Sequence, residues 1–198
     1  MNKIPETILS HARDLPEGSV LSPKEFLHLG SRAAIDQAFS RLAKEGKLQR
    51  VCRGTYVAPV SSRFGVRSPS PEKVVQSMAA QRGDTVVPHG AFAANSLGLT
   101  QQVPIREMFL TSGRSHKLQL GQSEVLVKHV PRWMLALGTS QAGAAVRALA
   151  WMGRPHVGES LAALRHKLPL AEWGHLTSSR GTLPSWMAQA IGEEITRG

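Results

Sequence analysis

Apolar residues in the first sixty positions recur first at helical spacing and then at strand spacing. A helix over roughly residues 3–14 is predicted because its apolar positions fall about every fourth residue: Ile4, Ile8, Leu9 and Ala12. A second helix is predicted between Ser31 and Gly46, where one side is apolar: Ile35, Ala38, Phe39 and Leu42. Both helices therefore have one face that packs on a core.

Start and stop signals between these helices predict a helix-turn-helix. The stretch Ser22-Pro23-Lys24-Glu25 is a capping box with proline at the first helical position, so a short helix begins there. Gly30 ends that helix after two turns, and Ser31 caps the next one. A short helix, a tight glycine turn and a longer helix are the components of this motif.

The segment after Gly46 changes to the pattern of a short hairpin. Leu48, Val51 and Val57 are apolar or β-favouring, and the pair Arg53-Gly54 supplies a turn. A hairpin at this place is typical of the wing of a winged helix. We therefore expect residues 1–60 to form a winged helix-turn-helix domain.

The remainder of the chain has a mixed pattern. Residues 61–71 are rich in serine, proline and arginine and are expected to be a linker. Residues 72–198 are expected to form an α+β domain, with a small, largely antiparallel sheet and C-terminal helices. The predicted strands lie in the segments "DTVVPHG", "REMFLTSG", "HKLQLG" and "SEVLVKHV", and the later helices in "QAGAAVRALAWMG", "GESLAALRHKL" and "PSWMAQAIGEEI".

Charge is concentrated around the second helix of the predicted motif. The chain carries 24 lysines and arginines against 14 acidic residues, a net charge of +10. Between Ser31 and Arg67 there are eight cationic residues and only Asp36 and Glu45 as anionic ones, a net charge of +6 in under a fifth of the chain. Such clustering favours a polyanionic partner over a general role in solubility.

The outward face of that helix has the chemistry of a recognition helix. Ala33 permits close approach, Gln37 can pair with adenine in the major groove, and Lys44 or Arg41 can bind phosphate. Ser40 shares this face, and Arg50 and Arg53 of the wing would reach the DNA backbone or minor groove. A winged helix that only mediates protein contacts is the alternative.

The sequence resembles a known family in three stretches. They are "GSVLSPKEFLHLGSRAAIDQAFSRLAKEGKLQRVCRGTYVAP", "PHGAFAANSLGL" and "FLTSGRSHKLQLG". Together they resemble the AbiEi-type antitoxins of bacterial type IV toxin–antitoxin (abortive infection) systems, in particular a short branch of winged-helix regulators. The resemblance is specific over Ser31–Tyr56 and around His89–Leu99, and it is vague after about Arg132.

This resemblance implies a DNA-binding antitoxin that represses its own operon. The winged helix would bind inverted repeats of double-stranded DNA in its own promoter. The second domain would counter a separate nucleotidyltransferase-like toxin, directly or indirectly. By resemblance the DNA role falls on these residues: Arg32, Gln37, Ser40, Arg41, Lys44, Arg50, Arg53 and Tyr56. The alternative is a regulator without a toxin, whose second domain senses a ligand or dimerises.

Composition excludes several other classes. The single cysteine, Cys52, forms no internal disulfide and cannot supply a zinc finger, which fits a reducing cytoplasm. No apolar run is long enough for a signal peptide or a membrane span, so we expect a cytoplasmic protein without a membrane partner.

We expect no catalytic residues, no metal and no cofactor. The eight histidines are scattered, and neither a Walker loop nor a dinucleotide fingerprint is present. A nuclease is disfavoured because Glu124 and Lys128 are four residues apart and lack the upstream aspartate that a metal site needs. Either His89 or Asn95 is expected to cap backbone groups in a tight strand-to-helix turn, with an anion site as the alternative.

Four tryptophans mark the C-terminal third: Trp133, Trp151, Trp173 and Trp186. We expect most of them in the core of the second domain, although an exposed apolar patch for a protein partner is an alternative. The last helix is amphipathic and terminal, and it is therefore the first segment to test at such an interface.

Overall fold

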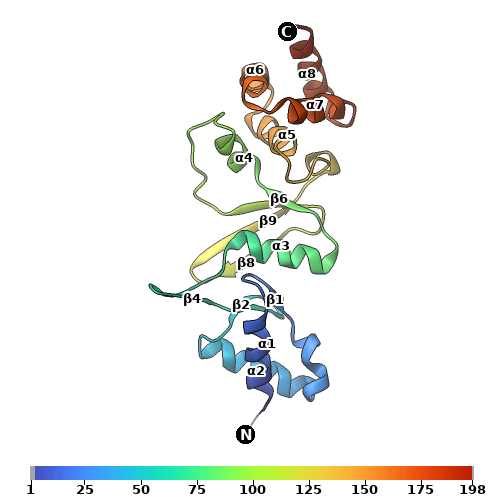
Figure 1. Cartoon of the computed structure of the whole chain (residues 1–198). Helices are drawn as coiled ribbons and strands as arrows, with labels where there is room; N and C mark the ends of the chain where they lie inside the picture. Colours follow the sequence, from blue (N-terminus) through green and yellow to red (C-terminus); the bar gives the residue numbers. More distant parts are fainter. Residues whose placement is uncertain (1–2, 198) are drawn as a thin grey trace. The chain divides into compact units, whose positions relative to one another are not determined.

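The protein is a mixed α+β chain whose computed structural model describes residues 3–197 (Figure 1). The expected α+β class is confirmed, with small antiparallel sheets and a helical C-terminal third. The chain divides into two compact units. Unit 1 contains the described residues up to Asp84 together with Ser115–Val127, and unit 2 contains Thr85–Arg114 and the residues from Lys128 onward. No helix within residues 3–197 combines the length and apolarity needed to cross a bilayer.

Unit 1 begins with three helical segments, α1 (Lys3–Asp14), η1 (Pro23–Leu29) and α2 (Arg32–Lys44). The predicted caps are confirmed: Ser22 and Glu25 form a reciprocal capping box, and the Ser31 hydroxyl accepts a hydrogen bond from the Ala34 backbone N–H at 3.3 Å. The short helix expected after Ser22 is present, and it is a 3₁₀-helix over Pro23–Leu29.

Three short strands follow or interrupt these helices: β1 (Val20–Leu21), β2 (Gln49–Cys52) and β3 (Thr55–Val57). They form an antiparallel sheet in the order β1-β3-β2. The predicted hairpin between β2 and β3 is confirmed, and it turns at Gly54, whose φ of 71° suits glycine. Strand β1 therefore pairs with β3, and this pairing links the segment before η1 to the β2–β3 hairpin.

The core of this body combines the apolar faces of α1, η1 and α2 with β3. Ile8, Ile35 and Phe39 are fully buried. Phe39 contacts Phe26 edge-on at 5.5 Å between ring centroids and Tyr56 at 4.8 Å. The apolar stripe predicted for α2 is confirmed, because its four residues are the ones that α2 buries: Ile35, Ala38, Phe39 and Leu42.

The expected linker is structured and unit 1 is larger than expected. Within residues 61–71 the chain forms most of a hairpin, β4 (Val60–Ser62) with β5 (Gly65–Arg67). Helix α3 (Pro71–Arg82) then packs on β1, where the Val20 N–H donates to the Ser77 hydroxyl at 3.1 Å. The expected boundary at residue 72 therefore differs from the observed one after Asp84. The serine- and proline-rich composition concealed a strand pair held mainly by backbone bonds.

Unit 1 is completed by a later hairpin, β8 (His116–Leu120) with β9 (Ser123–His129), of which the residues up to Val127 belong to this unit. Both strands were expected from the sequence, and the chain turns between them at Gly121, which has a φ of 60°. Strand β8 lies close to β2.

Unit 2 consists of a short strand pair and a helical bundle. Strand β6 (Val86–Pro88) pairs antiparallel with β7 (Met108–Thr111), and α4 (Gly90–Ser96) follows β6 directly. The remaining segments are η2 (Arg132–Met134), α5 (Gln141–Met152), η3 (Arg154–His156), α6 (Val157–Lys167), α7 (Leu170–Ser178), η4 (Ser179–Thr182) and α8 (Ser185–Arg197). Helix α7 and the 3₁₀ segments η2, η3 and η4 were not expected.

Helix α5 is the centre of unit 2. Its buried positions contact apolar residues of α6, α7 and α8, including Leu161, Leu176 and Met187. On another side α5 approaches α4 so closely that a Cβ atom at Gly90 would clash with the Arg147 carbonyl oxygen. Glycine at position 90 is therefore required by packing.

Candidate nucleic-acid interface

The face of α2 opposite the core is open to solvent. Every residue proposed for this face is exposed: Arg32, Ala33, Gln37, Ser40, Arg41 and Lys44. The same helix buries its apolar stripe, so its two faces differ sharply in chemistry. The predicted split between a core face and a cationic outer face is therefore present in the folded chain.

Ion pairs along α2 fix some of its cations. Arg32 bonds Asp36 at 2.8 Å, and Arg41 bonds Glu45 at the same distance. Lys47, which lies just after the helix, also contacts Glu45 at 2.8 Å. Exposed pairs of this kind contribute little to stability, because water and salt screen the attraction between the two charges. They do set the direction of long side chains that would otherwise sample many rotamers.

Lys47 and Arg41 also lower the pKa of the Glu45 carboxyl, with the bond from Lys47 as the larger cause. Glu45 therefore stays charged through the neutral range and partly neutralises the end of the helix. Among residues 3–197, neither Lys44 nor Arg53 takes part in an ion pair. Both cations are therefore free to bind an external anion.

The β2–β3 turn presents Arg50 and Arg53 to solvent. The Arg50 Nε donates to the Cys52 carbonyl oxygen at 3.4 Å, which keeps that side chain against its own strand. Cys52 is a half-buried free thiol. The turn therefore carries one tethered and one untethered guanidinium.

Tyr56 does not belong to this surface. Its side chain is only 7 % exposed and packs against Phe39 inside the core of unit 1. Its position on β3, between the paired residues of β1 and β2, turns the ring inward. The role suggested for Tyr56 by family resemblance is therefore wrong for the side chain. Lys47 is exposed at the same end of α2 and was overlooked, although its place in the basic run signalled it.

Glu17 connects three segments of unit 1. Its carboxylate accepts hydrogen bonds from Lys73 Nζ at 2.6 Å, from Arg67 Nη1 at 3.0 Å and from the Ser70 N–H at 3.1 Å. These bonds lower the pKa of Glu17 to about 2, with Lys73 as the largest cause. The base of the β4–β5 hairpin and the start of α3 are thus tied to the loop after α1. Nothing in the sequence signalled this long-range cluster.

His89 and Asn95 have structural partners. The His89 Nδ1 accepts from the Ala91 N–H at 3.2 Å and caps α4, and Asn95 Nδ2 donates to the Thr100 carbonyl at 3.3 Å. Burial, and secondarily the nearby charge of Lys128, lower the pKa of His89. The neutral imidazole is the form that can accept the capping bond. The expected cap of the strand-to-helix turn is confirmed for His89, whereas Asn95, near the end of α4, bonds the segment that follows the helix.

Glu124 is engaged with a neighbouring cation. Its carboxylate contacts Lys117 Nζ on the paired strand at 3.2 Å, and both side chains are exposed. Within residues 3–197, no group of three or more histidine, cysteine or acidic side chains is placed to hold a metal ion.

Unit 2 contains one fully buried cation, Arg147 of α5, which is 1 % exposed. Its Nη1 donates to the Gly138 carbonyl at 2.8 Å and to the Met134 carbonyl at 3.4 Å. Burial lowers the pKa of Arg147 to about 10. This arginine therefore closes the loop between η2 and α5 and is not available to an external partner.

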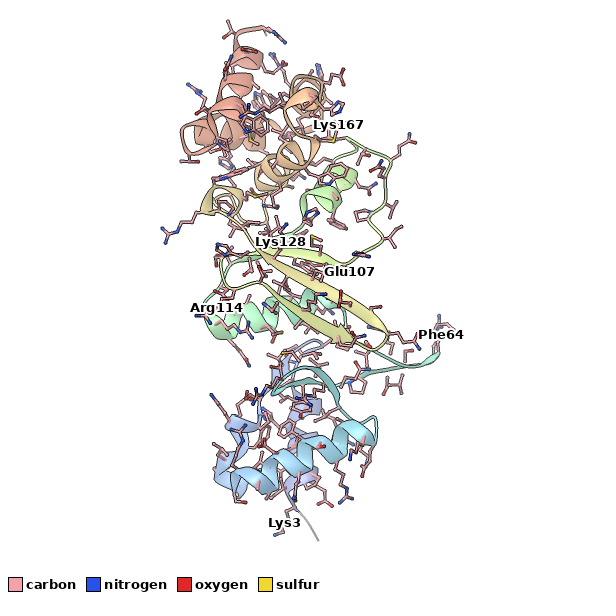
Figure 2. All side chains as sticks on the ribbon, turned by 180° about the vertical axis from the view of Figure 1, so that it is seen from behind. Lys3, Phe64, Glu107, Arg114, Lys128 and Lys167 are labelled. Atoms are coloured by element: carbon pink, nitrogen blue, oxygen red, sulfur yellow. The ribbon has the colours of Figure 1, made fainter. Side chains whose placement is uncertain are left out.

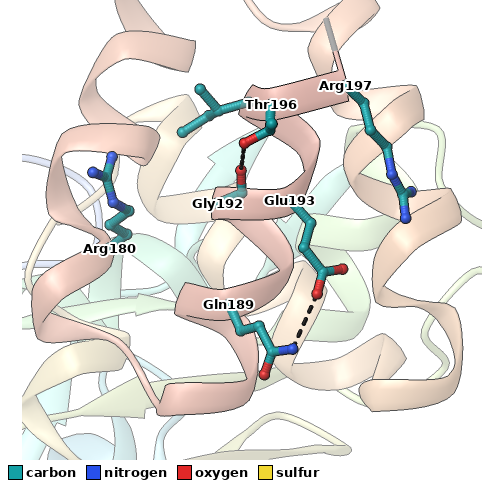
Figure 3. A pocket seen from close by; sticks show the side chains of 7 residues that line it. Arg180, Gln189, Gly192, Glu193, Thr196 and Arg197 are labelled. Carbon is teal, nitrogen blue, oxygen red and sulfur yellow. Dashed lines mark hydrogen bonds between the residues drawn. The ribbon is translucent and has the colours of Figure 1, made fainter.

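The last helix borders an open groove of about 670 Å³ (Figure 3). Arg180, Glu193 and Arg197 line it, and Gln189 Nε2 donates to the Glu193 carboxylate at 3.0 Å. Trp186 of the same helix is partly buried against the bundle, with the Arg154 guanidinium 5.9 Å from its ring centroid. Trp151 is 38 % exposed, so the tryptophans are divided between core and surface.

Comparison with known proteins places the chain in a family. Residues 6–168 match the family described as "Family of unknown function (DUF6088)", and the chain belongs to it. No curated protein matches. A crystal structure of the Rv2827c protein from Mycobacterium tuberculosis has a similar fold, with a TM-score of 0.53 and 17 % sequence identity. That similarity covers 96 % of this chain and 75 % of the other.

Proposed function

We propose that this DUF6088 protein is a DNA-binding antitoxin that represses its own operon, with α2 as the recognition helix of a winged helix in unit 1. The observation that carries the proposal is the coincidence of two features. The strand order β1-β3-β2 around three helical segments is the order that a winged helix requires, and the exposed face of α2 is cationic. Neither feature depends on the other.

The residues divide between reading bases and binding phosphate. Gln37 and Ser40, in the middle of the exposed face, have side chains of a length and chemistry suited to base edges in the major groove. Lys44 and Arg53, which have no anionic partner in the described chain, supply phosphate contacts. Arg32 and Arg41 are held by Asp36 and Glu45 and would need to exchange these partners for phosphate.

A binding titration tests the proposed DNA binding. The probe is a duplex of the promoter region upstream of the gene, with a mixed-sequence duplex as competitor. Lys44→Ala and Arg53→Ala should each weaken binding about tenfold and lower the slope of log affinity against log salt by about one. Arg106→Ala removes an exposed arginine of unit 2 and serves as the matched control. Equal losses in all three variants would contradict the proposal.

The proposed antitoxin role rests on the family resemblance and needs its own experiment. The neighbouring gene product is co-expressed with this protein, and both growth and co-purification are scored. Growth arrest that this protein relieves would support the toxin–antitoxin assignment. Relief without co-purification would indicate indirect neutralisation through repression, and no arrest at all would favour a regulator whose second unit senses a ligand or dimerises.

The surface of α8 is the first place to test for a toxin contact. It combines the exposed Ile195 with a charged groove lined by Arg180 and Arg197. Ile195→Glu should abolish co-purification and leave promoter binding unchanged, because α8 belongs to unit 2. Loss of promoter binding in this variant would contradict the separation of the two roles.

A further inference from the structure

The β4–β5 hairpin carries large apolar side chains that the described part of unit 1 leaves uncovered. Phe64 at its turn is 86 % exposed, and Val66 is 68 % exposed. Figure 2 shows Phe64 at the outer end of the hairpin, pointing into solvent. A two-stranded ribbon gains little from exposing such groups to water, because it is only marginally stable by itself. This exposure indicates a partner that covers the tip.

The tip has a fixed local conformation. The Ser62 hydroxyl accepts from the Phe64 N–H at 3.2 Å and donates to the Gly65 carbonyl at 2.9 Å, so one side chain bonds both sides of the turn. Gly65 has a φ of 111°, which side chains other than glycine rarely adopt. The Arg63 guanidinium lies 4.7 Å from the centroid of the Phe64 ring. A cation and an aromatic ring are therefore presented together.

The base of the hairpin is fixed to the same unit that carries α2. Arg67 at the end of β5 donates to the Glu17 carboxylate at 3.0 Å, and Ser70 and Lys73 bond the same carboxylate. Ser68 lies against the β8–β9 turn, where a Cβ atom at Gly121 would be only 2.8 Å from its hydroxyl oxygen. A partner that binds the tip therefore meets a ribbon with an anchored base and a preformed turn.

The charge of the hairpin identifies the kind of partner. Residues 60–68 contain Arg63 and Arg67 and no acidic residue, and they continue the basic run of α2 and the β2–β3 turn. Proteins that contact the DNA minor groove combine arginines with apolar side chains that wedge between base steps, phenylalanine among them. We infer that the β4–β5 hairpin is a second DNA-binding element, which inserts Phe64 into the minor groove beside the site bound by α2, with Arg63 on the groove wall.

This inference rests on the proposed DNA-binding function and adds an element and a mode of contact to it. The DNA would be locally unstacked at the step that receives the ring, so the duplex should bend when the protein binds. Because the contact is largely apolar, loss of Phe64 should change affinity and bending with little effect on the salt slope. Loss of Arg63 should lower the slope as well.

The test uses the full-length protein and a 30-base-pair duplex that the wild-type protein selects from a random pool. Dyes at the two ends of the duplex report bending by energy transfer, and anisotropy reports affinity. Phe64→Ala should weaken binding about tenfold and abolish the bend, whereas Phe64→Leu should retain most of both, since leucine also acts as a wedge. Leu170→Ala, which removes an apolar side chain 87 % exposed on unit 2, is the matched control.

The outcomes separate this inference from the function on which it rests. If no duplex is selected, both fail. If Lys44→Ala weakens binding while Phe64→Ala behaves like Leu170→Ala in affinity and bend, the hairpin inference alone is overturned. Light scattering measures the oligomeric state of the wild-type protein and of Phe64→Ala. A changed oligomeric state with unchanged DNA binding would overturn the inference and make the tip a contact between copies of the chain.

Discussion

Helices α2 and α5 are of nearly equal length, yet they use arginine in opposite ways. Helix α2 buries a single apolar stripe and holds Arg32 and Arg41 in solvent. Helix α5 is buried on most of its circumference and encloses Arg147. A helix with one buried stripe has a face available to a ligand, whereas a helix that is enclosed on most sides is a structural centre. Burial, and not residue type, decides which cations of this chain are functional candidates.

The partners of these arginines explain the difference. Arg41 meets a carboxylate in water, where the pair contributes little and exchanges easily. Arg147 donates to two backbone carbonyls, those of Met134 and Gly138. Among the hydrogen bonds of the described residues, no other donor reaches these two carbonyls. Its removal would leave both a cavity and unsatisfied buried acceptors, and each of these is costly.

The largest expected effect therefore compares two arginine-to-alanine substitutions. Arg147→Ala should lower the free energy of unfolding by about 3 kcal/mol, through the cavity and the lost hydrogen bonds. Arg41→Ala on the exposed face of α2 should change it by less than about 0.5 kcal/mol. Urea unfolding followed by circular dichroism measures both. Similar losses in the two variants would refute the contrast between the helices.

The next effect concerns the helix caps, which the two helices share. The Ser31 and Ser140 hydroxyls each accept from a backbone N–H in the first turn, at 3.3 Å and 3.0 Å. Ser31→Ala and Ser140→Ala should each cost about 1 kcal/mol, and Ser31→Asp should restore stability because aspartate is an equally good cap. Chemical unfolding provides the measurement. A loss in Ser31→Asp as large as in Ser31→Ala would argue against the cap as the cause.

A smaller effect depends on pH in unit 2. The pKa of His89 is lowered in the folded protein from its ordinary value of 6.5, so the unfolded chain binds a proton more readily. Stability should therefore be full above about pH 6.5 and fall as the pH drops below it toward the folded pKa. His89→Asn keeps a capping acceptor and should remove this part of the dependence. The measurement is the melting temperature of the wild-type protein and of His89→Asn from pH 8 to pH 5. Parallel curves for the two proteins would contradict a contribution of His89 to the pH dependence.

The smallest expected effect lies at the exposed cluster around Glu17 in unit 1. Its folded pKa of about 2 lies below the ordinary 4.5, so its contribution is present above pH 4.5 and is lost as the pH falls toward 2. Glu17→Gln should lower the melting temperature at neutral pH, and high salt should reduce the difference. Glu72→Gln, an exposed carboxyl at the start of α3 without an ion pair in the described chain, is the control. Equal shifts in both variants would exclude a specific role for Glu17.

Local sequence signals predicted the elements that depend on neighbouring residues. Helix α2 is defined by its own residues, because Ser31 caps its start and its apolar stripe has helical spacing. Gly54 in the same way defines the β2–β3 turn. The outward position of Gln37 and Lys44 follows from the helical period alone. The candidate surface on α2 was therefore predictable before any tertiary contact was known.

Features that depend on distant contacts were not predictable in this way. The burial of Tyr56 depends on Phe39, which lies on α2, and the enclosure of Arg147 depends on carbonyls at Met134 and Gly138. The β4–β5 hairpin was hidden because serines, arginines and a glycine interrupt its apolar residues, so that backbone pairing and not an apolar pattern defines it. Helix α3 belongs to unit 1 because Ser77 and Gln81 bond the backbone of Val20, about sixty residues earlier.

The central claim, that α2 enters the groove of a duplex, is tested most directly by cleavage from the helix itself. An iron–EDTA group is attached through Ser40→Cys in a Cys52→Ser background, and the cut positions are mapped on the selected duplex. The account predicts localised cuts on both strands at the centre of the protected site. Only weak, dispersed cleavage is expected when the group is attached through Ala162→Cys, at an exposed position of α6. Dispersed cleavage from both positions, with DNA binding intact, would contradict the claim.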